Sequence, residues 1–137
     1  MRERGATQAE AMEPQLLVQL DDPDPQVRAE AVSFLPVFSE GAEGAERFQH
    51  VTTLLADDPD RGVRIAAAER LGESESPEAV TPLVLALSDP DRDVVLAAIE
   101  ALEDVDDVSA IPELELLLED HVEEIRDAAE SAIQYIE

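Results

Sequence analysis

Cysteine and lysine are both absent from this 137-residue chain, and aromatic side chains are few. Without cysteine the protein has no disulfide and no thiolate metal site. The four aromatic residues, Phe34, Phe38, Phe48 and Tyr135, are too few to fill an interior. We therefore expect a core of leucine, valine, isoleucine and alanine, as in stacked helices.

Long apolar runs are also missing. No stretch approaches the roughly 18 apolar residues of a membrane-spanning helix, and no signal-type segment is present. We therefore expect a cytoplasmic protein without a membrane segment, and the length fits one domain.

Positive charge is scarce: 34 acidic residues face nine basic ones, all arginine, and the net charge is −25. Such a field repels nucleic-acid phosphates and anionic lipid, and it attracts cations or basic proteins. Two interpretations stay open. The acidity is either a general adaptation to a salty cytoplasm, as in proteins of salt-loving organisms, or a surface for a basic partner. The even spread of the acids favours the first.

One phrase of sequence occurs four times, with anchors at Val27, Val63, Val94 and Ile125, which lie 36, 31 and 31 residues apart. Apolar residues follow each anchor at positions +4 and +8, which form one face of a helix. Aspartates just before the anchor can accept hydrogen bonds from the free N–H groups of a helix start. A second apolar run precedes each turn. Each unit is thus a helix A, a turn and a helix B, and such units bury their apolar faces by stacking.

The phrase Leu-x-Asp-Pro-Asp-x-x-Val-Arg-x-x-Ala, clearest at residues 20–31 and 56–67, resembles the HEAT repeat family. It is most similar to the short 31-residue HEAT-like repeat of the phycobilisome lyases. The resemblance implies an all-α fold, a right-handed α-solenoid of four helical hairpins with about eight helices. Two positions depart from the pattern, because Val95 replaces the arginine of repeat three and the turn at Asp120 lacks its proline.

Residues 1–7 have no apolar pattern and are expected to be frayed. Residues 8–137 are expected to form one repeat domain, with repeats at 8–38, 45–72, 77–103 and 109–137. We expect the first B helix to cover 25–38, residues 39–44 to form a loop, and Gly72 to end the second B helix. The arginines after the anchors, Arg28, Arg64 and Arg126, should pair with turn carboxylates of their own or the adjacent repeat, such as Asp60 for Arg64.

No catalytic constellation is found. His50 and His121 are isolated, and no phosphate-binding loop or activated nucleophile is present. The acids Asp89, Asp91, Asp93 and Glu100 copy the acidic positions of a calcium-binding loop, but Val94 stands where that loop needs glycine. We therefore predict helix caps at these turns, with no enzyme activity, cofactor, metal site or nucleic-acid binding.

In HEAT-type stacks, positions +2, +6 and +9 of the B helices line the concave surface. Two large apolar residues, Ile65 and Leu96, stand at +2, with Glu69 and Glu100 at +6 and Glu103 at +9. An apolar centre with a charged rim is typical of protein interfaces. We predict a non-catalytic adaptor or scaffold whose protein partner, with a basic segment, contacts these five residues. The alternative for Ile65 and Leu96 is that the twist of the stack turns position +2 inward.

The name of the short repeat suggests a function of another class, as a subunit or chaperone-like component of a chromophore (bilin) lyase. A bilin lyase needs a longer or second chain and a groove richer in aromatic residues. The oligomeric state and the partner's identity do not follow from the sequence.

The net charge predicts that stability rises with salt. Self-repulsion at −25 is screened as the Debye length falls from about 10 Å at 0.1 M to about 3 Å at 1 M salt. Thermal melts in a chloride series should show the midpoint rising between these concentrations. A flat or falling midpoint would contradict the interpretation of the acidity as an adaptation to salt.

Overall fold

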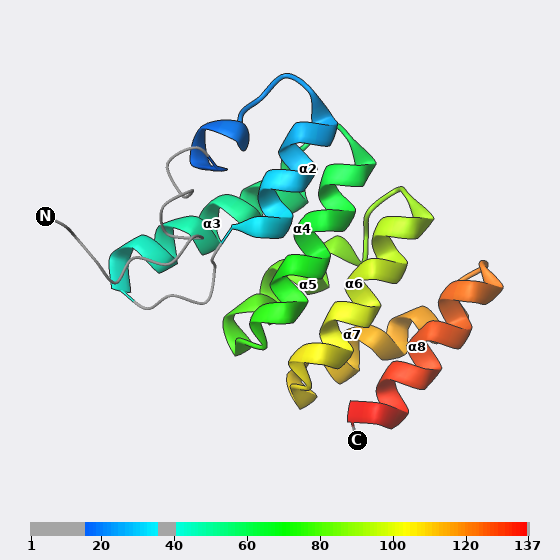
Figure 1. Ribbon diagram of the computed structural model, residues 1–137. Coiled ribbons are helices and arrows are strands. Elements are labelled where there is room, and N and C mark those ends of the chain that lie inside the picture. Colours follow the sequence, from blue (N-terminus) through cyan, green and yellow to red (C-terminus); the bar gives the residue numbers. More distant parts are fainter. Residues whose placement is uncertain (1–15, 36–40, 137) are drawn as a thin grey trace, which may run out of the picture.

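The computed structural model describes residues 16–35 and 41–136, with the backbone alone for 41–43. Within these ranges every regular element is a helix, and no strand occurs (Figure 1). The expected frayed terminus at 1–7, the start of the first A helix and residues 36–40 lie outside the described residues.

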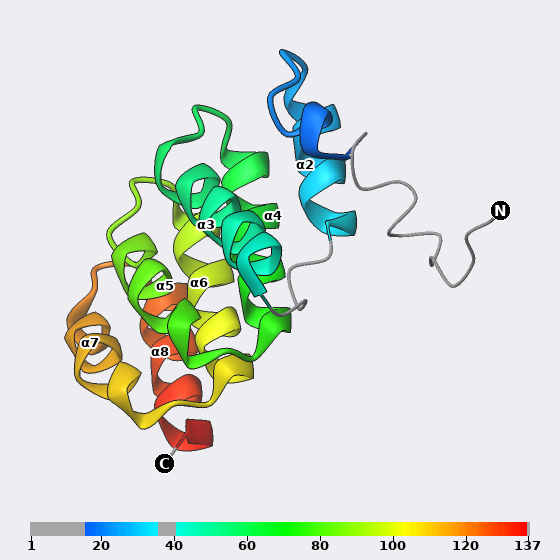
Figure 2. The ribbon, with the colours of Figure 1, turned by 90° about the vertical axis from the view of Figure 1, so that its left-hand side faces the viewer.

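The helices form two layers of a stack (Figures 1 and 2). The B layer contains α2 (Pro25–Phe34), α4 (Arg61–Ser74), α6 (Arg92–Val105) and α8 (Glu123–Ile136). The A layer contains a short helical segment at 16–19, then α3 (Gly41–Asp57), α5 (Val80–Ala86) and α7 (Ile111–Leu116). Single 3-10 turns at Pro77–Ala79 and Val108–Ala110 precede α5 and α7, and one at Leu117–Glu119 follows α7. The predicted all-α solenoid of stacked helical hairpins is confirmed.

Aspartate caps begin three of the B helices, as the turns predicted. Asp24 accepts a hydrogen bond from the N–H of Gln26, and Asp60 accepts one from the N–H of Val63. Asp91 accepts from the N–H groups of Asp93 and Val94, so its carboxylate is used at the helix start. No group of three or more histidine, aspartate or glutamate side chains in the described residues is arranged to hold a metal ion.

Two predicted helix boundaries were wrong. The first B helix ends at Phe34 and not at residue 38, because Leu35 is extended (ψ 129°) and precedes Pro36, before which α conformation is disfavoured. Gly41 and Gly44 were assigned to a loop, but they lie in the first turn of α3.

A third predicted boundary was also wrong: the sequence placed the end of the second B helix, α4, at Gly72. The helix continues to Ser74, and Glu75 takes the left-handed conformation instead (φ 53°). Gly72 is buried inside the helix, where an added Cβ would lie 2.8 Å from the Cα of Ala101 on α6. The glycine therefore permits the close approach of two B helices.

The B layer is packed more closely than the A layer. α4 and α6 contact each other along their length, whereas α3 and α5 touch only sparsely. The expectation that the B helices line a concave surface stays a prediction.

The core is aliphatic, as predicted. Its largest fully buried side chains are leucines, isoleucine and valines, and they form one cluster from Leu16 to Ile136. Phe34 and Tyr135 are exposed, and Phe48 is half-buried against the cluster.

The outer face of α8 is polar. Position +5 is fully buried at Val32, Ala68 and Ile99, where the next B helix covers it, but in α8 the same position is the exposed Glu130. Asp127 at +2 is exposed as well. α8 thus covers the core of repeat three and turns a hydrophilic face away from it.

An arginine–aspartate ladder joins the turns of successive repeats. Arg28 donates from Nε and Nη2 to the two carboxylate oxygens of Asp58 at 2.9 and 3.0 Å. Arg64 makes the same pair of bonds to Asp89, at 2.9 and 3.3 Å. Both partners are aspartates of the next repeat, which confirms the expected pairing with the adjacent repeat. The example given, Asp60 for Arg64, was wrong. Each arginine also donates from Nη1 to a carbonyl of its own turn, that of Asp22 or Asp58.

The ladder stops after repeat three. Val95 takes the arginine position and is buried, so Asp120 receives no arginine from that repeat among the described residues. Arg126 keeps only the bond within its own turn, from Nη1 to the carbonyl of Asp120 at 2.7 Å.

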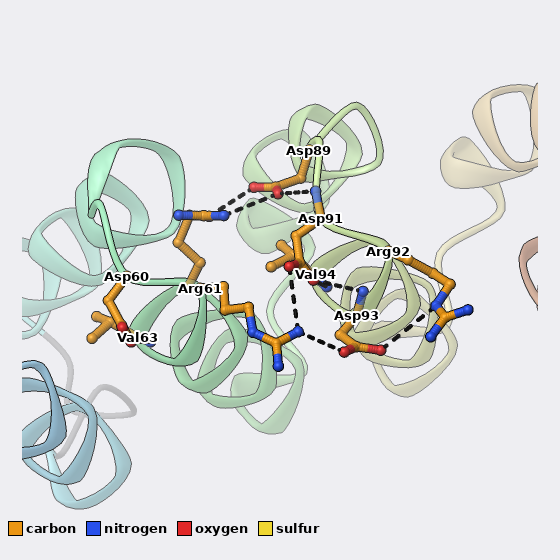
Figure 3. Close-up of polar contacts among 9 residues, drawn as sticks. Asp60, Arg61, Val63, Asp89, Asp91, Arg92, Asp93 and Val94 are labelled. Atoms are coloured by element: carbon orange, nitrogen blue, oxygen red, sulfur yellow. Dashed lines mark hydrogen bonds and ion pairs between the residues drawn. The ribbon is translucent and has the colours of Figure 1, made fainter.

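A second, exposed set of pairs runs beside the ladder (Figure 3). Arg61 Nη1 contacts Asp91 at 3.3 Å and Asp93 at 2.8 Å. The Arg61 side chain is 59% exposed, whereas that of Arg64 is 14% exposed. The two arginines therefore form pairs of different burial at the same junction.

We predict that Arg64→Ala destabilises the protein by on the order of 3 kcal/mol, because it leaves the nearly buried Asp89 carboxylate without its counter-charge. Arg61→Ala removes the same charge from an exposed pair and should cost much less. Urea unfolding of both variants measures the difference. If both variants lose the same free energy of unfolding, the arginines of the ladder stabilise the protein only by reducing its net negative charge.

Candidate functional site on the B layer

The five predicted contact residues lie on α4 and α6 in the B layer. Ile65 and Leu96 are half-buried and pack against the core, so position +2 is turned partly inward. Glu69 and Glu100 are exposed, and Glu103 is half-buried. Glu69 and Glu100 are therefore the exposed part of the predicted set.

A hollow of about 230 Å³ lies between α4 and α6 on this surface. Its floor contains the buried Ala97 and Ala101, whose small side chains leave room above the close helix contact at Gly72. Four carboxylates surround it: Glu69, Glu73, Glu100 and Asp104.

Burial and mutual repulsion raise the pKa values of three acids here. The pKa of Glu69 is raised by partial burial and then by the charges of Glu100 and Glu73. Partial burial is also the largest cause for Glu103 and Asp104, whose pKa values are raised further by neighbouring acids. Glu100 repels all three. The ionised form of these carboxylates is therefore disfavoured, because water reaches them only in part and their negative charges repel one another.

Only one of these acids has a cationic partner within the described ranges. Glu73 accepts a bond from Nη1 of Arg70 at 2.8 Å. The same guanidinium donates from Nε and Nη2 to the carbonyl of Leu35 at 3.0 and 2.6 Å, which fixes it against the end of α2. No ion pair involves Glu69, Glu100, Glu103 or Asp104 in the described part of the chain.

Sequence reasoning missed Glu73 and Asp104. Both stand at position +10 of their repeats, one helical turn beyond +6 and on the same face. The equivalent residue of α8 is Tyr135, whose side chain is 66% exposed. Extending the register by one turn would have found all three residues.

His50 lies within α3, and His121 lies in the turn before α8. His50 Nε2 is 3.7 Å from Asp21 Oδ1, and His121 Nδ1 is 3.7 Å from Asp120 Oδ1. Within the described residues, no helix combines the length and apolar character needed to cross a bilayer.

Comparison with known proteins agrees with this architecture. Residues 48–134, more than half of the chain, match the family model for HEAT repeats. No curated protein matches the sequence significantly.

Several solved structures share the fold at low sequence identity. A designed armadillo repeat protein in complex with the peptide (KR)4 superposes with a TM-score of 0.70 at 23% identity, over 93% of this chain and 65% of that one. Armadillo repeat proteins computationally designed for modular peptide recognition give 0.65 and 20%, over 91% and 64%. An engineered protein gives 0.59 and 24%, over 88% and 60%. The chain thus spans less than two thirds of each of these structures.

We predict that Glu100→Gln stabilises the protein at neutral pH, by under about 1 kcal/mol, because it removes the charge that repels three neighbours. Acids with raised folded-state pKa values cost stability while ionised, and this cost disappears as the pH falls through those values. The gain should therefore shrink as the pH approaches the ordinary carboxyl range near about 4.

Urea unfolding at both pH values measures the effect. Glu115→Gln, at an exposed position of α7, changes the net charge equally and is the control. If it stabilises the protein as much as Glu100→Gln does, the repulsion is global rather than local.

Proposed function

The chain belongs to the HEAT repeat family, and we propose that it is a non-catalytic protein-binding module whose B layer binds a basic segment of a partner. The contact residues of this proposal are Ile65, Leu96, Glu69, Glu100 and Glu103, extended by Glu73 and Asp104.

The observation that carries the proposal is the acidic cluster around the hollow between α4 and α6, in which only Glu73 has an arginine partner within the described ranges. An arginine or lysine side chain entering the hollow relieves repulsion among carboxylates that already share a confined surface. The alanine floor leaves room for such a side chain. A charge-assisted contact here therefore contributes more free energy of binding than a contact with one isolated surface glutamate does.

Apolar and aromatic groups supplement the charge. Ile65 and Leu96 offer partly accessible surface on the same two helices as Glu69 and Glu100. Tyr135 is exposed at the register of Glu73 and Asp104, and its ring can pack against a guanidinium. Charges speed the encounter, and such anchors supply much of the affinity.

The similar solved structures support the class of partner. One was solved with the basic peptide (KR)4, and another was designed for peptide recognition. A two-layer helical stack is therefore a suitable support for an extended basic segment. The adaptor or scaffold role, and the choice between a salty cytoplasm and a basic partner as the cause of the acidity, stay predictions. The bilin-lyase alternative rests on the sequence resemblance alone.

Charge reversal at the cluster tests the proposal. We expect Glu100→Arg to weaken binding of the peptide (KR)4 by about tenfold or more, because it places a cation inside the hollow. Fluorescence anisotropy near physiological salt, with the labelled peptide, measures the dissociation constant.

Glu115→Arg on α7 is the matched control, because it changes the net charge by the same amount outside the hollow. Loss of binding through unfolding is not expected, since Glu100→Arg removes a repulsion. Equal weakening by both variants would contradict a localised site. It would leave only general attraction between an acidic protein and a basic peptide.

A further inference from the structure

A groove of about 1090 Å³ runs between α3 and α5 in the A layer, on the side of the stack away from the acidic hollow. α3 packs along α4, and α5 packs along α6, but α3 and α5 make few contacts with each other. The buried Leu55 and Ala86 lie at its base, with Phe48 and Leu85 on its walls. The Leu85 side chain is 68% exposed.

Basic side chains are distributed unequally between the layers. Six of the seven arginines in the described ranges lie on helices of the B layer, and the seventh, Arg47 on α3, is buried. The groove is lined by acids at its margins, among them Asp57, Glu78 and Asp89. Asp89 is already bonded to Arg64, so Asp57 and Glu78 are the acids open to a partner.

Exposed apolar side chains are concentrated on the A layer in the second half of the stack. Leu85 on α5, Leu116 on α7, and Val108 and Leu118 on the adjoining 3-10 turns are all exposed. Of these, only Leu85 lines the groove, whose lining combines apolar, neutral polar and acidic residues with no basic one. Such a groove suits a partner that is itself apolar on one side and basic at its flanks.

We propose that this groove binds an amphipathic, basic helix of another protein. Its apolar stripe would pack between Phe48 and Leu85, and its lysines or arginines would face Asp57 and Glu78. A third helix can lie in the groove between two others, where its ridges of side chains pack against both. A second copy of this chain is a poor occupant, because the groove offers no cation to offset the −25 charge of each copy.

A peptide made only of leucine and lysine is the probe. It has about 18 residues, five helical turns, with leucines at i, i+3, i+4 and i+7 spacing. A scrambled peptide of the same composition spreads the leucines around the helix and carries the same charge. Binding of each labelled peptide is measured by anisotropy near physiological salt.

Two variants locate the site. Leu85→Asp places a charge in the groove, and Leu116→Asp places the same charge at the equivalent position of α7, which does not line the groove. Both leucines are largely exposed, so both variants should fold, which circular dichroism checks. We expect the amphipathic peptide to bind wild type and Leu116→Asp equally, and Leu85→Asp about tenfold more weakly. Glu100→Arg should leave this binding within about twofold of wild type, which separates it from binding at the B layer.

Three results would overturn the proposal. One is equal binding to Leu85→Asp and Leu116→Asp, and another is equal binding of the amphipathic and scrambled peptides. The third is self-association of the wild type in sedimentation that Leu85→Asp abolishes, because the occupant would then be a second copy.

Discussion

At the second and third turns, the aspartate that opens the turn makes two connections at once, and the junctions between the first three repeats depend on them. Asp58 accepts the guanidinium of Arg28 from the preceding repeat and, through Oδ1, the backbone N–H of Asp60 in its own turn. Asp89 does the same for Arg64 and Asp91. One carboxylate therefore fixes the shape of a turn and its position against the previous repeat. Because the aspartate is nearly buried, it needs the arginine, and the two residues act as a unit.

The carboxylates whose pKa values are shifted fall into two groups with opposite effects on stability. Partial burial opposes the shift at Asp91, but the backbone N–H of Asp93 and the charge of Arg61 hold its pKa below the usual range. Such a group stabilises the fold at neutral pH, and that contribution is lost as the pH falls through its lowered pKa. Glu69, Glu103 and Asp104 have raised pKa values, so their ionised forms lower the stability at neutral pH. As the pH falls, these acids are protonated before Asp91 is, and their destabilising effect disappears first. Mild acid thus relieves the repulsion on the acidic surface of α4 and α6 before it weakens the helix start at Asp91.

The sequence predicted the parts of the fold that repeat: the helix pairs, the caps and the aliphatic core all follow from the anchor register. It failed where one residue serves a contact between repeats. Gly72 has the character of a helix end, but its function is to admit Ala101, and only the distance between two helices reveals this. Arg64 has an aspartate four residues before it, yet it bonds to Asp89 in the next repeat. At the candidate site, position +6 gave Glu69 and Glu100, whereas the inward turn of Ile65 and Leu96 depends on the twist of the whole stack.

The distribution of the few cations determines what each face can bind. Three arginines bind within the stack. Arg28 and Arg64 bind Asp58 and Asp89 where repeats join, and Arg70 binds the carbonyl of Leu35 at the end of α2. The hollow on the B layer and the groove on the A layer are consequently both acidic. Charge alone then cannot distinguish their ligands, since a basic segment is attracted to either. In our two proposals shape and apolar contact do so: the small hollow over two alanines suits single side chains, whereas the larger groove beside Phe48 and Leu85 suits an apolar stripe.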